Sequence, residues 1–181
     1  GGAWGDDDFV WMKEYLQLEG LVYKLVPIKT PVKRGASTID LGFVDTEKMY
    51  DMIVNKEYEN GTRKGWFFGA SGSDKIYHDV ETRRNAFNYR LHFSRLIENL
   101  LMEEKNEQAK VIADLAMKHF PFEHYGSYEL LEPFLATYYE LGEQETAREL
   151  ASKMIEKYQE KIKYYASLDM YLQRSLLYDA G

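Results

Sequence analysis

The stretch YYELGEQETARELASKMIEKY, residues 138–158, decides the fold of this 181-residue chain. A glycine at position 142 separates two segments whose apolar and small residues recur at helical spacing. Ala147 and Ala151 are small enough to let a second helix approach closely, and the glycine marks the turn between the helices. The stretch therefore predicts the turn and the second helix of a helical hairpin.

An earlier segment follows the same scheme. Helical spacing predicts a helix over 83–104, a break at Lys105-Asn106 follows, and a second helix over 107–120 ends before Pro121. The small or flexible residues at the helix contact recur 38 residues later: Ala109, Ala113 and Ala116 in the first unit, and Ala147, Ala151 and Met154 in the second.

In tetratricopeptide repeats of about 34 residues, small residues lie where paired helices touch, a glycine often opens the turn and a proline often closes the unit. Both units fit this pattern, although the second lacks the closing proline. We therefore predict a mainly α fold of tetratricopeptide-like helical hairpins, a short α-solenoid, with a small extended or β segment at the N-terminus. A generic antiparallel helical bundle is the alternative.

The pattern divides the chain into three parts. Residues 1–8, GGAWGDDD, are expected to be a cloning scar or a disordered start, as in a piece cut from a longer protein. Residues 9–78 are predicted to hold an extended segment, a helix and a long loop that pack on the repeats. Residues 79–181 are predicted to hold the repeats and a final tyrosine-rich helix that covers their exposed apolar face.

Within the first 78 residues the pattern is less regular. Residues 21–26 predict a mostly buried extended segment, which Pro27 and Pro31 place at an edge, and residues 37–43 are a candidate to pair with it.

A helix is predicted to begin at Asp45-Thr46 and to end near Asn60-Gly61. The glycine-containing loop over 60–75 is then expected to be held by three aromatic residues, Trp66, Phe67 and Phe68.

Composition limits the possible partners. A net charge of −7 argues against nucleic acid as a ligand, because polyanion binders need a basic surface. The arginines of the third part, Arg83, Arg84, Arg90 and Arg95, lie among acidic residues. They predict a solvated helix face or local ion pairs, with an anion site as the alternative. The absence of cysteine excludes disulfides, thiolate metal sites and a cysteine nucleophile.

No pattern predicts catalysis by this chain. His119, Glu123 and His124 form a possible metal-ligand trio, but Pro121 interrupts the helix that would place them on one face, and capping or packing histidines are the simpler interpretation. The loop over 60–75 lacks phosphate-loop spacing, and no serine lies in a nucleophile elbow. We predict no catalytic residue, no metal and no cofactor, with a small hydrolase or metal enzyme as the weakest alternative.

Repeat solenoids usually bind their ligands on the concave face, which the first helix of each unit lines. Six residues occupy that face in the predicted register: Ser94, Glu98, Met102, Glu129, Glu132 and Tyr139. Solvated helix faces give the same pattern, so a binding role for these six is a hypothesis. The acidic members favour an extended polypeptide with basic or hydroxyl-bearing residues.

Four segments together carry a resemblance to a known family: YLQLEGLVYKLVPIK, GFVDTEKMYDMIVNK, DVETRRNAFNYRLHFSRLIENLL and ATYYELGEQETARELASKMIEKY. In this order the chain, from about Tyr15 to Tyr165, resembles the C-terminal soluble region of bacterial multi-pass membrane proteins that are similar to eukaryotic transmembrane protein O-mannosyltransferases. The loop over 60–75 departs from that pattern. The matching residues are scaffold residues, so the resemblance assigns no active site.

The resemblance implies a setting and a role. The parent protein would be a membrane-embedded glycosyltransferase-like enzyme, and this chain a non-catalytic interaction domain on the extracytoplasmic, periplasmic side of a bacterial membrane. It would bind or position a protein partner or acceptor. A free-standing peptide-binding tetratricopeptide-like scaffold, unrelated to sugar transfer, is the alternative, and both hypotheses leave the oligomeric state open.

Overall fold

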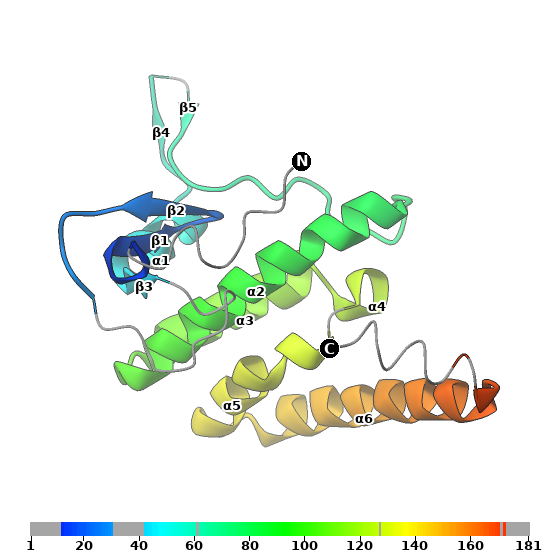
Figure 1. Ribbon diagram of the computed structural model, residues 1–181. Helices are drawn as coiled ribbons and strands as arrows, with labels where there is room; N and C mark the ends of the chain where they lie inside the picture. The colour runs from blue at the N-terminus through cyan, green and yellow to red at the C-terminus, as the bar shows by residue number, and fades with distance from the viewer. Residues whose placement is uncertain (1–11, 31–41, 61, 127, 171, 173–181) are drawn as a thin grey trace.

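The computed structural model describes residues 12–30, 42–60, 62–126, 128–170 and 172 (Figure 1). The predicted scar at residues 1–8 lies outside these ranges. The predicted mainly α fold with a small N-terminal β segment is confirmed. In chain order the elements are η1 (Lys13–Tyr15), β1 (Leu16–Glu19), β2 (Val22–Leu25), β3 (Phe43–Val44), α1 (Thr46–Val54), β4 (Tyr58–Glu59), β5 (Thr62–Arg63), α2 (Val80–Met102), α3 (Asn106–His119), α4 (Phe122–Tyr125), η3 (Tyr128–Leu130), α5 (Glu132–Glu140) and α6 (Gln144–Ser167).

The N-terminal sheet has the strand order β2-β1-β3. β1 and β2 form an antiparallel hairpin, and β3 pairs with β1 in parallel. The predicted edge position of the segment over 21–26 is confirmed, but its predicted burial is wrong, because every residue of β2 is exposed. The central strand β1 instead supplies the buried residue Leu18, which lies in the core with Val44 of β3.

Helix α1 begins as predicted and ends earlier. The Asp45 side chain caps it by accepting a hydrogen bond from the backbone N–H of Lys48, and Met49 and Ile53 face the core. The helix stops at Val54 and not near Asn60, because the Asn55 side chain accepts from the backbone N–H of Glu57 and turns the chain into β4.

The loop after α1 contains the small hairpin of β4 and β5. Trp66 and Phe68 pack against the core as predicted, whereas Phe67 is 78% exposed. Two of the three aromatic residues, Trp66 and Phe68, therefore attach this loop to the hydrophobic core.

α2 and α3 form an antiparallel helical pair that carries most of the core. Asp79 caps α2, with its carboxylate accepting from the backbone N–H of Thr82 at 2.7 Å. The contact surface joins larger residues of α2 to smaller ones of α3, namely Phe93, Leu96, Ile97 and Leu100 with Ala109, Ile112, Ala113 and Ala116.

The turns of the two hairpins have the same geometry. Glu104 and Gly142 both have positive φ, 59° and 75°. In each turn the next N–H donates to a carbonyl five residues back, from Lys105 to Leu100 at 2.8 Å and from Glu143 to Tyr138 at 2.9 Å. The local hairpin prediction is thus correct for both units.

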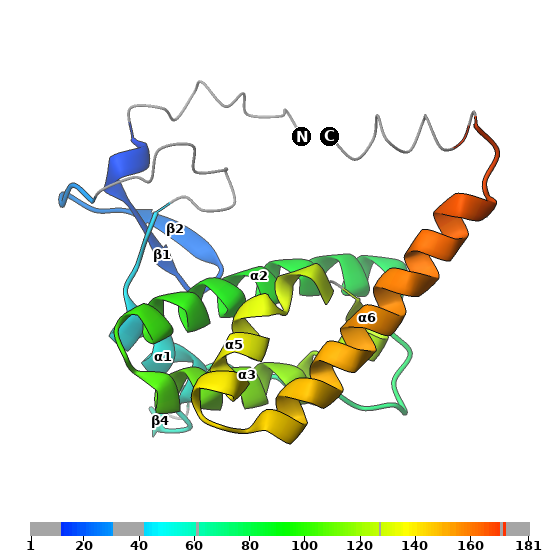
Figure 2. The same cartoon turned by 90° about the horizontal axis from the view of Figure 1, so that it is seen from below.

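The packing nevertheless does not show tetratricopeptide-like repeats. α5 has nine residues, against 23 in α2, because α4 and η3 occupy the chain before it and Pro133 lies at its first turn. α5 packs on both α2 and α3, while α6 packs mainly on α5 (Figure 2). The second hairpin is therefore not a stacked copy of the first.

The segment predicted as a final covering helix instead continues α6 in the residues described. α6 runs unbroken from Gln144 through residues 157–167, since no glycine or proline interrupts it, and leads away from the sheet (Figures 1 and 2). Ile155 and Ile162 are 56% and 65% exposed, and Tyr158 and Lys161 contact the ring of Tyr128.

The arginine prediction is half correct. Arg83 and Arg84 are exposed, and Arg84 forms an ion pair with Glu81 at 3.4 Å. Arg90 and Arg95 are buried, with 1% and 6% of their surfaces exposed. They are not members of a solvated face.

Replacing Ala113 with leucine is expected to lower the free energy of unfolding by about 1–3 kcal/mol, because this residue is fully buried between α2 and α3 and the extra side chain overpacks the contact. Ala151→Leu is the matched control, since Ala151 is only partly buried. Chemical denaturation measures both. Equal effects in the two variants would contradict this account of the packing.

Glu104→Gly is expected to raise the free energy of unfolding by about 0.5–1 kcal/mol, because glycine adopts the positive φ of this turn without strain. The neighbouring Glu103→Gly is the control, since Glu103 has a φ of −89°, and glycine there increases the freedom of the unfolded chain and removes the contacts of the carboxylate with Thr46 and Lys105. Thermal and urea unfolding should show Glu104→Gly to be more stable than the parent chain and Glu103→Gly to be less stable.

Candidate functional site

The first half of α2 is bordered by two hollows that meet at three shared lining residues, Leu21, Asn85 and Tyr89. Their volumes are about 510 Å³ and 630 Å³. Together they form the aromatic groove, whose walls are the β1–β2 turn, β2, the 66–71 loop, α2 and the segment after α3. Eight phenylalanine, tyrosine and tryptophan rings line it: Tyr23, Trp66, Phe67, Phe68, Phe87, Tyr89, Phe120 and Tyr125.

A close backbone approach builds one wall of the groove. Gly20 has a φ of 64° at the β1–β2 turn, and a Cβ there would lie 2.8 Å from the Trp66 ring. Gly65 lies against the backbone of Asn55, where a Cβ would come within 1.9 Å of the carbonyl oxygen. The backbone N–H of Trp66 donates to the Met52 carbonyl at 2.8 Å. Both glycines are needed to seat Trp66 between the hairpin and α1.

The rings then pack in sequence along the groove. Trp66 meets Tyr89 edge to face with centroids 5.8 Å apart, and Tyr89 stacks on Phe120 at 5.0 Å. The Tyr125 hydroxyl donates to the Ser71 carbonyl at 2.7 Å and fixes the loop at the far end. Offset and edge-to-face contacts of this kind add to the stabilisation from burial, so the aromatic wall is held in place by its own packing.

Arg95 attaches β2 to α2 at the other end of the groove. Its guanidinium donates to the Tyr23 hydroxyl at 3.0 Å and to the Gly42 carbonyl at 2.9 Å. A buried arginine that bridges two strands in this way fixes the distance between the sheet and the helix.

The polar groups of the groove carry little charge. Glu19 is the one charged residue among those lining the two hollows. Its carboxylate accepts hydrogen bonds from Lys48 and Lys24. These contacts, chiefly the one with Lys48, lower the pKa of the Glu19 carboxyl. The Asn85 side chain is exposed and forms no hydrogen bond with the described part of the chain. Its amide is therefore available to a ligand.

His92 lies in the second hollow as a neutral group. Burial, with Arg95 as a second cause, lowers its pKa from 6.5 to about 4. Its Nδ1 has no hydrogen-bond partner in the described residues, and its ring meets Tyr23 at 6.4 Å. At neutral pH this end of the groove carries no charge.

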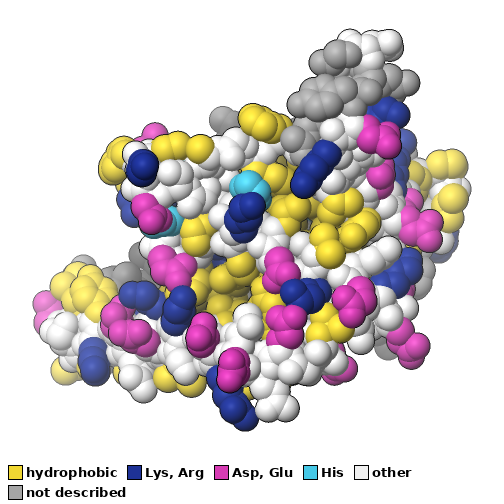
Figure 3. Space-filling model, turned by 180° about the vertical axis from the view of Figure 1, so that it is seen from behind, with side chains coloured by type: hydrophobic (Ala, Val, Ile, Leu, Met, Phe, Trp, Pro, Cys, Tyr) yellow, Lys and Arg dark blue, Asp and Glu magenta, His cyan; other side chains and the backbone are white. Residues whose placement is uncertain are grey.

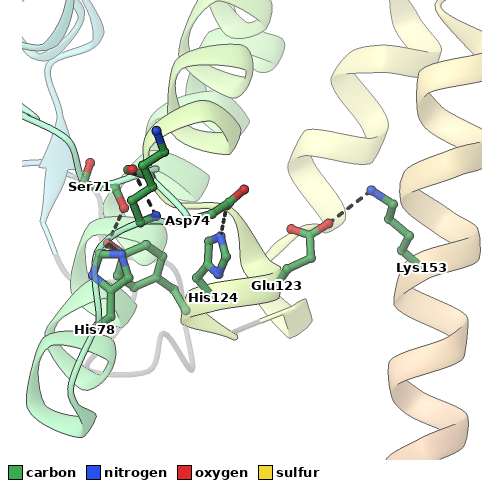
Figure 4. Close-up of polar contacts among 9 residues, drawn as sticks. Ser71, Asp74, His78, Glu123, His124 and Lys153 are labelled. Atoms are coloured by element: carbon green, nitrogen blue, oxygen red, sulfur yellow. Dashed lines mark hydrogen bonds and ion pairs between the residues drawn. The ribbon is translucent and has the colours of Figure 1, made fainter.

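The three residues of the possible metal trio each contact a different partner. His124 pairs with Asp74 at 2.8 Å, and Glu123 pairs with Lys153 of α6 at 3.1 Å (Figure 4). His119 stacks on Phe68 with ring centroids 4.8 Å apart. Among the described residues no three histidine, aspartate or glutamate side chains are grouped to hold a metal ion. These histidines form packing and loop contacts.

None of the six residues predicted for a concave face lies in the aromatic groove. Ser94 is buried within α2, which leaves it no surface for a ligand. Met102 and Tyr139 are exposed at the ends of α2 and α5. Glu98, Glu129 and Glu132 are exposed on α2, η3 and α5.

Charged side chains of both signs alternate over the face opposite to that of Figure 1, with hydrophobic side chains in the recesses between them (Figure 3). A surface of mixed sign on this face is unlike the basic stripe of a nucleic-acid binder.

Comparison with known proteins gives a family match over a range that includes the β1–β2 hairpin. Residues 1–48 match the sequence model of a family described as TMEM260-associated domain 2. The match fits a TMEM260-related membrane protein family, and gives no support to a similarity to O-mannosyltransferases or to a bacterial origin. No curated protein and no solved structure matched the chain. No helix among the described residues is long and apolar enough to cross a membrane.

His92 is expected to make stability depend on pH. Its folded-state pKa is lowered, so the folded chain holds fewer protons than the unfolded chain between pH 6.5 and pH 4. Stability is therefore lost as pH falls through this window, by up to about 3 kcal/mol from this group.

His92→Phe keeps the ring and removes the titration. Urea denaturation at pH 6.5 and pH 4.5 measures the free energy of unfolding of both chains. Between these two pH values the parent chain should lose more unfolding free energy than the variant does. An equal difference at both values would show that His92 does not titrate in this range.

Proposed function

We propose that this chain is a non-catalytic interaction domain that binds or positions a protein partner or acceptor for a membrane-embedded, glycosyltransferase-like protein. The observation that carries the proposal is the aromatic groove. Ligand sites are concave, mostly apolar and lined by a few polar groups, and this groove combines eight aromatic rings with the amide of Asn85.

The near-neutral lining defines the chemistry of the partner. Charged side chains would lose hydration there without gaining an opposite charge, so the groove favours apolar and hydroxyl-bearing residues. The acidic residues of the concave-face hypothesis favoured basic or hydroxyl-bearing residues, and the groove favours the hydroxyl-bearing ones and not the basic ones. Aromatic rings beside a hydroxyl-bearing segment suit the presentation of an acceptor polypeptide.

Two observations support the membrane setting in this proposal, a family match and a sequence resemblance. The match to a TMEM260-related membrane protein family supports attachment to a membrane protein. The O-mannosyltransferase likeness and the periplasmic side of a bacterial membrane rest on the resemblance of the four sequence segments. A free-standing scaffold would use the same groove, and the family match favours the attached form.

Asn85→Arg tests the groove without disturbing the core, because the Asn85 side chain is exposed and hydrogen-bonded to no described residue. The variant places a charge and a long side chain in a near-neutral hollow, so binding of a panel of uncharged serine- and threonine-rich decapeptides should weaken at least tenfold. Thr146→Arg on the exposed surface of α6 adds the same charge elsewhere and should leave binding unchanged. Titration calorimetry gives the affinities.

Three further arms complete the experiment. Aspartate-rich decapeptides and monosaccharides should bind the parent chain more weakly than the uncharged panel. If peptide binding weakened equally in both arginine variants, the groove would not be the binding site. Turnover of a glycoside or an ester by the isolated chain would overturn its non-catalytic part.

A further inference from the structure

β2 is an edge strand that no described residue covers. It pairs with β1 on one side, and its residues are exposed along their whole length. Unpaired strand edges present a row of N–H and C=O groups that can pair with another chain. The β2 edge is therefore a hydrogen-bonding surface as well as a wall of the aromatic groove.

The register shows which groups point outward. The loop of two residues between Glu19 and Val22 makes these two a hydrogen-bonded pair, and such pairs then alternate along an antiparallel ladder. The N–H of Val26 donates to the carbonyl of Tyr15 at 2.8 Å, which fits the same alternation. Tyr23 and Leu25 lie between these pairs, so their N–H and C=O groups face away from β1.

The second hollow of the groove lies between β2 and α2. Tyr23 contributes from the strand, and its hydroxyl is fixed by Arg95. Phe87, Asn88 and Leu91 contribute from the helix. A strand edge that faces a helix across a hollow is the arrangement in which an extended peptide can pair with the strand and place alternate side chains against the helix.

Charge complementarity selects the occupant. The residues that line this hollow carry no charge at neutral pH, and Lys24, whose side chain is on the other face of the strand from Tyr23, is engaged by Glu19. The segment that enters must therefore be uncharged at the positions that face α2.

We propose that an extended, uncharged polypeptide segment adds to the free edge of β2 as a fourth strand and places alternate apolar or hydroxyl-bearing side chains in the hollow against α2. This inference rests on the proposed function and names how the partner binds. Main-chain hydrogen bonds to Tyr23 and Leu25 supply affinity, and the hollow supplies selectivity.

The test uses random nonapeptides selected by display on the whole 181-residue chain. Leu25→Pro removes an outward N–H and no hydrogen bond to β1, and proline is tolerated on an edge strand. Leu25→Ala is the matched control, because it truncates the side chain and keeps the N–H. The selected peptides should bind Leu25→Pro at least tenfold more weakly than Leu25→Ala, and melting curves check that both variants fold.

A second measurement leaves the chain unaltered. Each selected peptide is N-methylated at one position at a time, and strand addition predicts loss of binding at every second position, because only alternate N–H groups face β2. Effects without this alternation, together with equal binding to the two Leu25 variants, would overturn strand addition and leave groove binding standing. Failure of the parent chain to select any peptide would defeat the proposed function and this inference together.

Discussion

The helical body depends on a buried cation. Arg90 of α2 donates a hydrogen bond through Nη2 to the carbonyl of Phe120, just beyond the end of α3, and its guanidinium lies 5.9 Å from the ring centre of Phe134. Burial lowers its pKa to about 10, while Glu123 and Glu129 act in the opposite direction. A positive charge at the carboxyl end of a helix is favourable, which offsets part of the cost of burying it.

The same contact positions the candidate site. Arg90 holds the backbone of Phe120, and the ring of Phe120 stacks on Tyr89 in the aromatic groove. Five residues further along α2, Arg95 points to the sheet and holds Tyr23 and the backbone of Gly42. Five helical positions turn by about 140°, so the two arginines leave α2 on different sides. One helix thus fixes both walls of the groove through two guanidinium groups.

Local signals in the sequence predicted the elements well. Asp45 marked a helix start by capping chemistry, and spacing predicted breaks at Lys105-Asn106 and at Gly142, beside the observed turns at Glu104 and Gly142. The packing does not show the predicted solenoid, because spacing does not state how two hairpins stack. The nine residues of α5 leave the second unit too short to copy the first.

The groove could not be predicted in the same way. The contact of Gly20 with Trp66 joins residues far apart in the chain, and neither lies in a periodic pattern. Ser94 was placed on a binding face because the first helix of each predicted unit was expected to line a concave face, yet β3, α1, α3 and α5 all pack against α2. Arg90 and Arg95 were interpreted as surface charges because acidic residues lie near them in the sequence, yet both are buried. Polar residues on a helix that is packed on several sides are structural more often than their composition indicates.

The open edge of β2 has features that limit unwanted pairing. An edge strand with exposed apolar residues is a site for aggregation unless charge or proline interrupts it. β2 carries Lys24 at its centre, and Pro27 follows two residues after the strand ends. A second copy of this strand would bring two Lys24 side chains into the same small sheet, where like charges oppose pairing. A partner without charges meets no such penalty, so the edge that resists self-association remains open to a neutral segment of another chain.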